Sequence, residues 1–252
     1  MVTAYDEPSA RLADAAGVDL LLVGDSLANV VLGQPDTLQV SVEDMAHHVR
    51  AVVAARPSAH VVADLPWLSY HLGEHDAVRN AATLVRAGAQ SVKLEGGRRR
   101  LDVVRAIIDA EIPVMGHLGL TPQSVLAFGG FKVQAKTREA MSALVEDAVA
   151  LQEAGVYAIV VEGVPPVVGT AVTEALEIPT IGIGAGPDTD GQVLVFHDLL
   201  GLSGRAPAKF VRQYADLGTA ITEAVGRYAA DVRAGAFPSG AEVYATPPEL
   251  LD

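Results

Sequence analysis

The segment AGVDLLLVGDS, residues 16–26, decides the fold, because it recurs twice more along the chain in related form. The related segments are AGAQSVKLEGG, residues 87–97, and AGVYAIVVEGV, residues 154–164. Each begins with Ala-Gly, continues as a short apolar run, and reaches a carboxylate eight, seven and seven residues after the glycine. Short apolar runs bounded by glycine are typical of buried β-strands. The sequence therefore predicts three strands that end in acids, which would meet at one mouth of a sheet.

Strand-like and helix-like patterns alternate along the whole chain. Eight segments are predicted as strands: residues 2–5, 19–23, 60–63, 90–94, 112–116, 157–161, 179–182 and 193–196. Helices are predicted between them, over residues 8–16, 42–55, 75–87, 98–110, 137–154 and 166–176. Apolar strands that alternate with helices imply a parallel sheet. Eight such units predict an α/β protein with a (β/α)8 TIM barrel, and a doubly wound open sheet is the alternative.

The chain is long enough for one large hydrophobic core. It has 252 residues, of which 50% are hydrophobic, and no Pro/Gly/Ser-rich linker or block of charge interrupts it. An α/β barrel of about 250 residues is a single domain. We therefore expect one barrel domain over residues 1–252, with a C-terminal helical extension from about residue 210. Such a tail is expected to pack on a partner subunit.

Composition and charge exclude several classes of function. A net charge of −13 argues against a nucleic-acid partner, because that binding needs clustered Lys and Arg. The chain has no cysteine, which excludes disulfides and thiolate–zinc sites and suits a reducing compartment. The first residues do not follow the pattern of a secretory signal, and no apolar run reaches the roughly 20 residues of a membrane helix. We expect a cytoplasmic protein with no membrane partner.

Polar residues at the predicted strand ends form the candidate site. They are Asp6, Asp25, Ser26, Asp64, Lys93, Glu95, His117 and Glu162. In a barrel these positions face one another at the C-terminal mouth, where catalytic groups lie. Clustered carboxylates repel one another unless a cation offsets their charge. Oxygen ligands completed by water are what Mg²⁺ prefers, so the pattern indicates a magnesium site rather than a zinc site.

Three features of this rim allow two readings each. Lys93 and Glu95 lie two residues apart on one strand and share a face, so Lys93 either pairs with Glu95 or Asp64 or receives a substrate carboxylate. His117 is either a hydrogen-bonded structural group or a residue that lines the site. The glycines of GIGAG, residues 182–186, either cradle a phosphate or form a tight turn with positive φ.

Nine motifs give the chain a resemblance to the ketopantoate hydroxymethyltransferase family. They occur in order as TAYD (3–6), LVGDSL (22–27), ADLPW (63–67), VKLEGG (92–97), GHLGLTPQS (116–124), FGGFKVQ (128–134), VEGVP (161–165), IPTIGIGAG (178–186) and TDGQVLVFHDLLG (189–201). No single motif is decisive, but nine in register are highly specific. The resemblance implies a Mg²⁺-dependent barrel of the phosphoenolpyruvate/pyruvate type and a homodecamer.

The resemblance also implies an activity and residue roles. Members transfer a hydroxymethyl group from the co-substrate 5,10-methylenetetrahydrofolate to 3-methyl-2-oxobutanoate, giving 2-dehydropantoate in pantothenate and coenzyme A biosynthesis through a Mg-stabilised enolate. The matching positions imply metal ligands at Asp25, Asp64 and Glu95. They imply substrate-binding groups at Asp25, Ser26, Asp64 and Lys93, and a catalytic proton acceptor at Glu162. The expected partners are thus a small 2-keto acid, a folate and further copies of this chain.

Two other functions remain as alternatives. A lyase or mutase of the same barrel superfamily would also use Mg²⁺ and a 2-keto acid. Such enzymes typically carry a flexible loop with a reactive cysteine or an equivalent, and this chain has no cysteine. A non-enzymatic barrel could keep the acids for stability alone. The loss of Glu162 or Lys93 would indicate that third case, and both residues are present.

Overall fold

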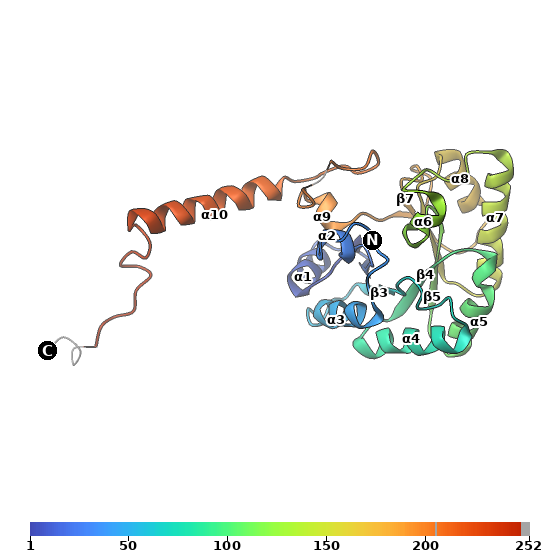
Figure 1. Ribbon diagram of the computed structural model, residues 1–252, viewed down its shortest axis with the longest axis horizontal. Coiled ribbons are helices and arrows are strands. Elements are labelled where there is room, and N and C mark those ends of the chain that lie inside the picture. The colour runs from blue at the N-terminus through green and yellow to red at the C-terminus, as the bar shows by residue number, and fades with distance from the viewer. Residues whose placement is uncertain (205, 248–252) are drawn as a thin grey trace. The chain divides into compact units, whose positions relative to one another are not determined.

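The computed structural model describes residues 1–204 and 206–247 (Figure 1). The chain divides into two compact units. The first contains Met1–Phe196 together with Pro207–Val211, and the second contains the remaining described residues from His197 onward. The first unit carries the sheet and its surrounding helices, and the second carries one long helix.

Eight parallel strands form one sheet whose spatial order follows the chain order. They are β1 (Val2–Thr3), β2 (Leu20–Val23), β3 (His60–Asp64), β4 (Ser91–Glu95), β5 (Val114–Gly119), β6 (Ala158–Glu162), β7 (Thr180–Ile183) and β8 (Gly191–Gln192). A parallel bridge joins Val2 to Leu194, just beyond β8, and the Thr3 amide donates to the Leu194 carbonyl at 3.2 Å. These contacts close the sheet. The predicted (β/α)8 barrel is confirmed, and the open-sheet alternative is wrong.

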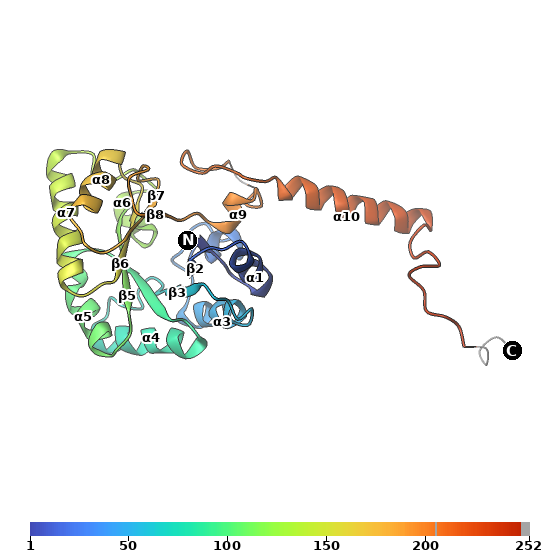
Figure 2. The ribbon, with the colours of Figure 1, turned by 180° about the vertical axis from the view of Figure 1, so that it is seen from behind.

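Helices surround the sheet in both views (Figures 1 and 2). In the first unit they are α1 (Glu7–Ala15), α2 (Leu27–Val30), α3 (Val42–Val53), α4 (Glu74–Ala87), α5 (Leu101–Asp109), α6 (Val125–Phe128), α7 (Arg138–Glu153) and α8 (Pro166–Glu174), with short 3-10 turns η1 (Arg98–Arg100) and η2 (Pro122–Ser124). Side chains that satisfy free backbone N–H groups set where the helices begin. Ser41 accepts from the Asp44 amide before α3, and Thr137 accepts from the Ala140 amide before α7.

The interior of the barrel is filled with apolar side chains. Leu22, Val62, Met115, Val160 and Ile181 come from five different strands and form one buried cluster. Layers of branched side chains are the usual content of such a barrel, which is a packed core and not a channel. Polar groups can therefore gather only beyond this cluster, at the ends of the strands.

Three predicted boundaries shift. The last strand ends at Gln192, because the Phe196 amide donates to Thr3 Oγ1 at 2.9 Å and the chain turns into α9 (Phe196–Leu199). The helix predicted over residues 98–110 begins with a 3-10 turn, where the Arg98 amide donates to Asp147 Oδ1 at 3.1 Å. The tail helix α10 (Leu217–Ala234) begins seven residues later than predicted, because Asp216 accepts from the Thr219 amide and caps it.

The second unit contains α10, an 18-residue helix with no buried residue. Ile221, Val225, Tyr228 and Val232 are exposed and follow one another at intervals of three or four residues, which places them on one face. Among the described residues, no helix has the length and apolar character needed to cross a membrane.

Two helical glycines provide a test of how tightly the barrel packs. A Cβ at Gly169, in α8, would clash with the backbone carbonyl oxygen of Ala185, whereas a Cβ at Gly226, in α10, would meet nothing within 4 Å. We predict that Gly169→Ala lowers the free energy of unfolding by about 1–3 kcal/mol through overpacking. Gly226→Ala leaves it unchanged or raises it by up to about 1 kcal/mol. Thermal and denaturant unfolding measure both, and equal effects of the two substitutions would contradict the packing argument.

Candidate active site

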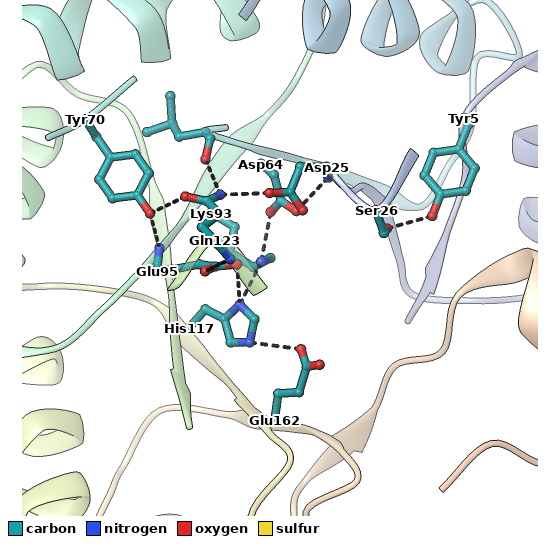
Figure 3. Close-up of polar contacts among 11 residues, drawn as sticks. Tyr5, Asp25, Ser26, Asp64, Tyr70, Lys93, Glu95, His117, Gln123 and Glu162 are labelled. Carbon is teal, nitrogen blue, oxygen red and sulfur yellow. Dashed lines mark hydrogen bonds and ion pairs between the residues drawn. The ribbon is translucent and has the colours of Figure 1, made fainter. Parts of the chain in front are cut away.

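The predicted polar residues meet at one end of the barrel around a cavity of about 100 Å³ (Figure 3). The cavity is lined by Asp25, Ser26, Asp64, Lys93, Glu95, His117 and Glu162, together with apolar strand residues. Asp6 is the exception. It is exposed, and its side chain accepts from the Ser9 amide at 2.8 Å to cap α1, so its prediction as part of the rim is wrong.

Asp25 and Asp64 lie next to each other at the ends of β2 and β3. The Asp25 amide donates to Asp64 Oδ2 at 3.0 Å, and both residues are almost fully buried, with 4% and 3% of their surfaces exposed. Burial raises the pKa of Asp25 well above its usual range, and repulsion from Asp64 and Glu95 raises it further. These effects disfavour the ionised form of Asp25, so a cation bound beside Asp25 and Asp64 would stabilise it.

Lys93 is the cation that this structure places among the acids. Its Nζ lies 2.9 Å from Asp64 Oδ1, because β3 and β4 pair in a register that sets Asp64 opposite Lys93. Burial opposes the charge of Lys93, but Asp64, Glu95 and Asp25 outweigh it and raise its pKa. Lys93 is therefore positively charged near neutral pH, and of its two predicted roles the structure shows the pairing with Asp64.

His117 lies at the centre of the cluster, where it lines the cavity and also contacts three of the charged residues. Its Nδ1 lies 3.1 Å from Lys93 Nζ and 3.5 Å from Glu95 Oε1, and its Nε2 lies 3.2 Å from Glu162 Oε2. Burial and Lys93 lower the pKa of His117, but its contacts with Glu162 and Glu95 outweigh them and raise that pKa to about 9. The ring thus joins Glu162 on β6 to the groups on β4 (Figure 3).

Gln123 and Tyr70 hold the acidic groups in place and were missed as site residues from the sequence. Gln123 Nε2 donates to Asp25 Oδ2 at 2.8 Å, and its backbone amide donates to Glu95 Oε2 at 3.0 Å. The Tyr70 hydroxyl donates to Gln123 Oε1 at 2.6 Å and accepts from the Glu95 amide at 3.2 Å. The motif GHLGLTPQS contains Gln123, but nothing in its pattern shows that this side chain spans from one acid to another.

Ser26 stands at the edge of the cavity. Its Oγ lies 2.8 Å from the hydroxyl of Tyr5, which burial keeps un-ionised by raising its pKa. A Cβ at Gly24 would come within 2.8 Å of Ser26 Oγ and 3.5 Å of Asp64 Oδ2. The glycine before Asp25 therefore allows the close approach of these polar groups.

The donor set fits a magnesium ion held by few protein ligands. Within residues 1–204 and 206–247, no group of three or more His, Asp or Glu side chains is arranged to hold a metal. Mg²⁺ is usually bound through one or two carboxylates, with water and substrate oxygens in the other positions. The adjacent carboxylates of Asp25 and Asp64, whose mutual repulsion shows in the raised pKa of Asp25, meet that requirement.

The comparisons with known proteins identify the family of this chain. The family model described as ketopantoate hydroxymethyltransferase matches residues 1–240. The chain belongs to the ketopantoate hydroxymethyltransferase family. The 3-methyl-2-oxobutanoate hydroxymethyltransferase of Syntrophomonas wolfei is 54% identical to it over 253 residues, which cover 100% of this chain and 92% of that protein.

Two solved structures resemble this hydroxymethyltransferase-family chain in fold. One is 2,3-dimethylmalate lyase, a member of the PEP mutase/isocitrate lyase superfamily, at 20% identity and a TM-score of 0.59 over 99% of this chain and 87% of that one. The other is phosphonopyruvate hydrolase in complex with oxalate and Mg²⁺, at 16% identity and a TM-score of 0.60 over 97% and 86%. These likenesses show the barrel fold and do not support a lyase or mutase activity.

The contacts of His117 predict how stability depends on pH when no metal is bound. Its pKa is about 9 in the folded protein and about 6.5 when unfolded, so its stabilising effect is complete below pH 6.5 and is lost as the pH rises to 9. At about 1.4 kcal/mol for each pKa unit, the loss reaches about 3 kcal/mol.

We predict that urea unfolding with chelator present shows this fall between pH 6.5 and 9, and that His117→Gln shows a much smaller one. Parallel pH curves for the two proteins would contradict the role of Glu162 and Glu95 in raising this pKa.

Proposed function

We propose that this protein transfers a hydroxymethyl group from 5,10-methylenetetrahydrofolate to 3-methyl-2-oxobutanoate, giving 2-dehydropantoate for pantothenate and coenzyme A biosynthesis. The observation that carries the proposal is that buried Asp25, Asp64 and Lys93 and half-buried Glu162 line one small cavity, in a chain of the hydroxymethyltransferase family. A 2-keto acid has a carboxylate and an adjacent keto group, and the C–H bond next to the keto group is acidic. In this cluster, Asp25 and Asp64 suit a metal that binds the oxygens, Lys93 suits the carboxylate, and Glu162 suits the C–H bond.

Asp25 and Asp64 are proposed to hold Mg²⁺, with Glu95 completing the site through water. Glu95 is buried and accepts from the Gln123 amide, so it is fixed in position and still carries a second carboxylate oxygen. When bound, the ion supplies Lewis-acid chemistry that makes the C–H bond next to the keto group easier to break. The presence of oxalate and Mg²⁺ in phosphonopyruvate hydrolase, which shares this fold, supports this assignment.

The keto acid is proposed to bind in the 100 Å³ cavity, where Asp25, Ser26, Asp64 and Lys93 are the substrate-binding residues. Lys93 is the only one of these four groups that carries a positive charge, so it is placed to attract the substrate carboxylate. Ser26 Oγ offers a hydroxyl at the margin of the cavity. Holding the keto acid in one orientation directs its C3–H bond toward the base and lowers the entropic part of the barrier.

Glu162 is proposed as the catalytic base. Its side chain is 15% exposed, whereas that of His117 is 3% exposed, so Glu162 is the more accessible member of this pair. It takes the proton from C3, and the electron pair left behind forms a carbon–carbon bond to the iminium form of the folate methylene. Water then cleaves the bond to nitrogen, which leaves the hydroxymethyl group on the product and releases tetrahydrofolate. His117 Nε2 holds the Glu162 carboxylate in place throughout.

The resemblance to the family extends the proposal to the whole molecule. We propose a cytoplasmic homodecamer in which residues 1–252 form one barrel domain with a helical tail. The apolar face of α10 supports a role for the tail in assembly, because such faces are usually buried against a partner.

Binding of metal and keto acid should be synergistic. We predict that Mg²⁺ and 3-methyl-2-oxobutanoate together raise the melting temperature more than the sum of their separate effects, because each completes the site of the other. A ligand at 100 times its Kd stabilises by about 2.7 kcal/mol. Asp25→Asn should abolish the joint shift, while Asp102→Asn, on a side chain that is 84% exposed, should keep it. If wild-type protein shows no joint shift, the proposed metal site is wrong.

Removal of the base should separate binding from chemistry. We predict that Glu162→Gln keeps metal-dependent binding of the keto acid but lowers hydrogen–deuterium exchange at C3 by about 10²–10⁴-fold, the usual contribution of general base catalysis. Glu174→Gln, at an exposed position on α8, is the matched control and should exchange normally. NMR of the keto acid in D₂O follows the reaction. Exchange at the wild-type rate in Glu162→Gln would show that another group is the base.

A further inference from the structure

A second cavity, of about 450 Å³, lies beside the acidic cavity and shares Glu95 with it. Loops that follow β3, β4 and β5 enclose it, and Tyr70 and Gln123 stand in its wall. Ligand cavities for drug-sized molecules are about 300–1,000 Å³, so the acidic cavity is too small for such a molecule and the second one is large enough. Apart from the shared Glu95, the residues that line the second cavity are not proposed to bind the metal or the keto acid.

One side of this second cavity is positively charged. It is lined by all three arginines of η1, in a chain whose net charge is −13. Arg98 is engaged, because it contacts Glu146 at 2.7 Å and Asp147 at 2.6 Å. Arg100 lies 5.9 Å from the centre of the Tyr70 ring, and neither Arg99 nor Arg100 has a carboxylate partner within the described part of the chain. Two guanidinium groups are thus available for an anionic ligand.

The rest of the wall combines an aromatic surface with an unsatisfied polar atom. Phe128 lines the cavity and is followed by Gly129 and Gly130, whose φ angles of 65° and 116° turn the chain sharply after the ring. His71 Nδ1 is buried and has no hydrogen-bond partner among the described residues. Buried polar atoms without partners are rare in folded proteins, so this atom is suited to a polar group of a ligand. Such walls fit a flat heteroaromatic ring that carries an anionic tail.

We propose that this second cavity binds the one-carbon donor, a reduced folate, with its ring system against Phe128 and the carboxylates of its glutamate tail on Arg99 and Arg100. The inference rests on the function proposed above and assigns its second substrate to a place. The shared wall at Glu95 brings donor and keto acid together, which carbon transfer requires. The acidic cavity itself suits an anionic tail less well, because its four carboxyl groups outnumber Lys93 and His117.

Two other cavities meet these requirements less well. A cavity of about 630 Å³ between the start of α7 and α8 is lined by Lys136 and Arg138 but shares no lining residue with the acidic cavity. A smaller cavity is lined by Asp19 and Pro179, which precede β2 and β7, so it lies at the opposite ends of the strands. The first of these two is the useful comparison, because it is large and also basic.

The test compares matched arginine substitutions in the two large basic cavities. The double variant Arg99→Ala/Arg100→Ala should raise the Kd for tetrahydrofolate and the KM for 5,10-methylenetetrahydrofolate at least tenfold, with the KM for the keto acid within twofold of wild type. Arg138→Ala, in the other cavity, should leave both constants for the folate within twofold of wild type. Phe128→Ala should weaken folate binding by a similar factor, through loss of the ring contact.

A tail-less tetrahydropterin separates the two parts of the ligand. It should bind wild type and the double arginine variant equally, because it lacks the carboxylates, and it should bind Phe128→Ala more weakly. Unchanged tetrahydrofolate binding in both the double variant and Phe128→Ala, or weaker binding in Arg138→Ala alone, would overturn the inference. The proposed function is tested separately by hydrogen–deuterium exchange at C3 of the keto acid, measured with wild-type protein and no folate. If this exchange occurs but folate binding is unchanged in the variants, only the assignment of the folate cavity is wrong. If this exchange does not occur, the proposed function is wrong.

Discussion

The buried ion pair between Lys93 and Asp64 is the interaction on which the site depends. Its two atoms lie 2.9 Å apart with almost no solvent access, among further carboxylates from β2, β4 and β6. A buried charge without a partner is strongly destabilising, so the lysine offsets part of the negative charge and the acids in turn keep the lysine protonated. The four carboxyl groups that line the acidic cavity still outnumber Lys93 and His117, so the site can accept a further cation.

Closure of the barrel brings these oppositely charged side chains together at one mouth. Parallel register sets Asp64 opposite Lys93 and Glu95 opposite His117, so side chains from neighbouring strands reach the same mouth. The apolar cluster beneath them fills the interior of the barrel. Gln123 then connects Asp25 to the loop after β5, and through Tyr70 to the backbone of Glu95. The site is therefore rigid on the side where a metal is proposed and more open at Glu162.

The mouth of the barrel contains two cavities of opposite charge, the acidic cavity and the second cavity. The acidic cavity is small and suits a metal with a compact keto acid. The second cavity is larger, is lined by arginines and an aromatic ring, and suits a folate. Glu95 belongs to both walls, and the Tyr70–Gln123 contact lies beside it. In the proposed function, charge would direct the two anionic substrates to different cavities, because only the keto acid would have a metal to offset the acids around it.

The sequence by itself predicted the alternating strands and helices, the barrel as the favoured fold and most of the polar residues at its mouth, because glycine-bounded apolar runs that stop at an acid are a local signal. It also identified the family from nine motifs. Tertiary structure alone decided that Asp6 caps a helix, that His117 joins Glu95 to Glu162, and that Gln123 spans from Asp25 to Glu95. These contacts join residues up to 98 positions apart, so they depend on strand register and loop path, which no local pattern encodes.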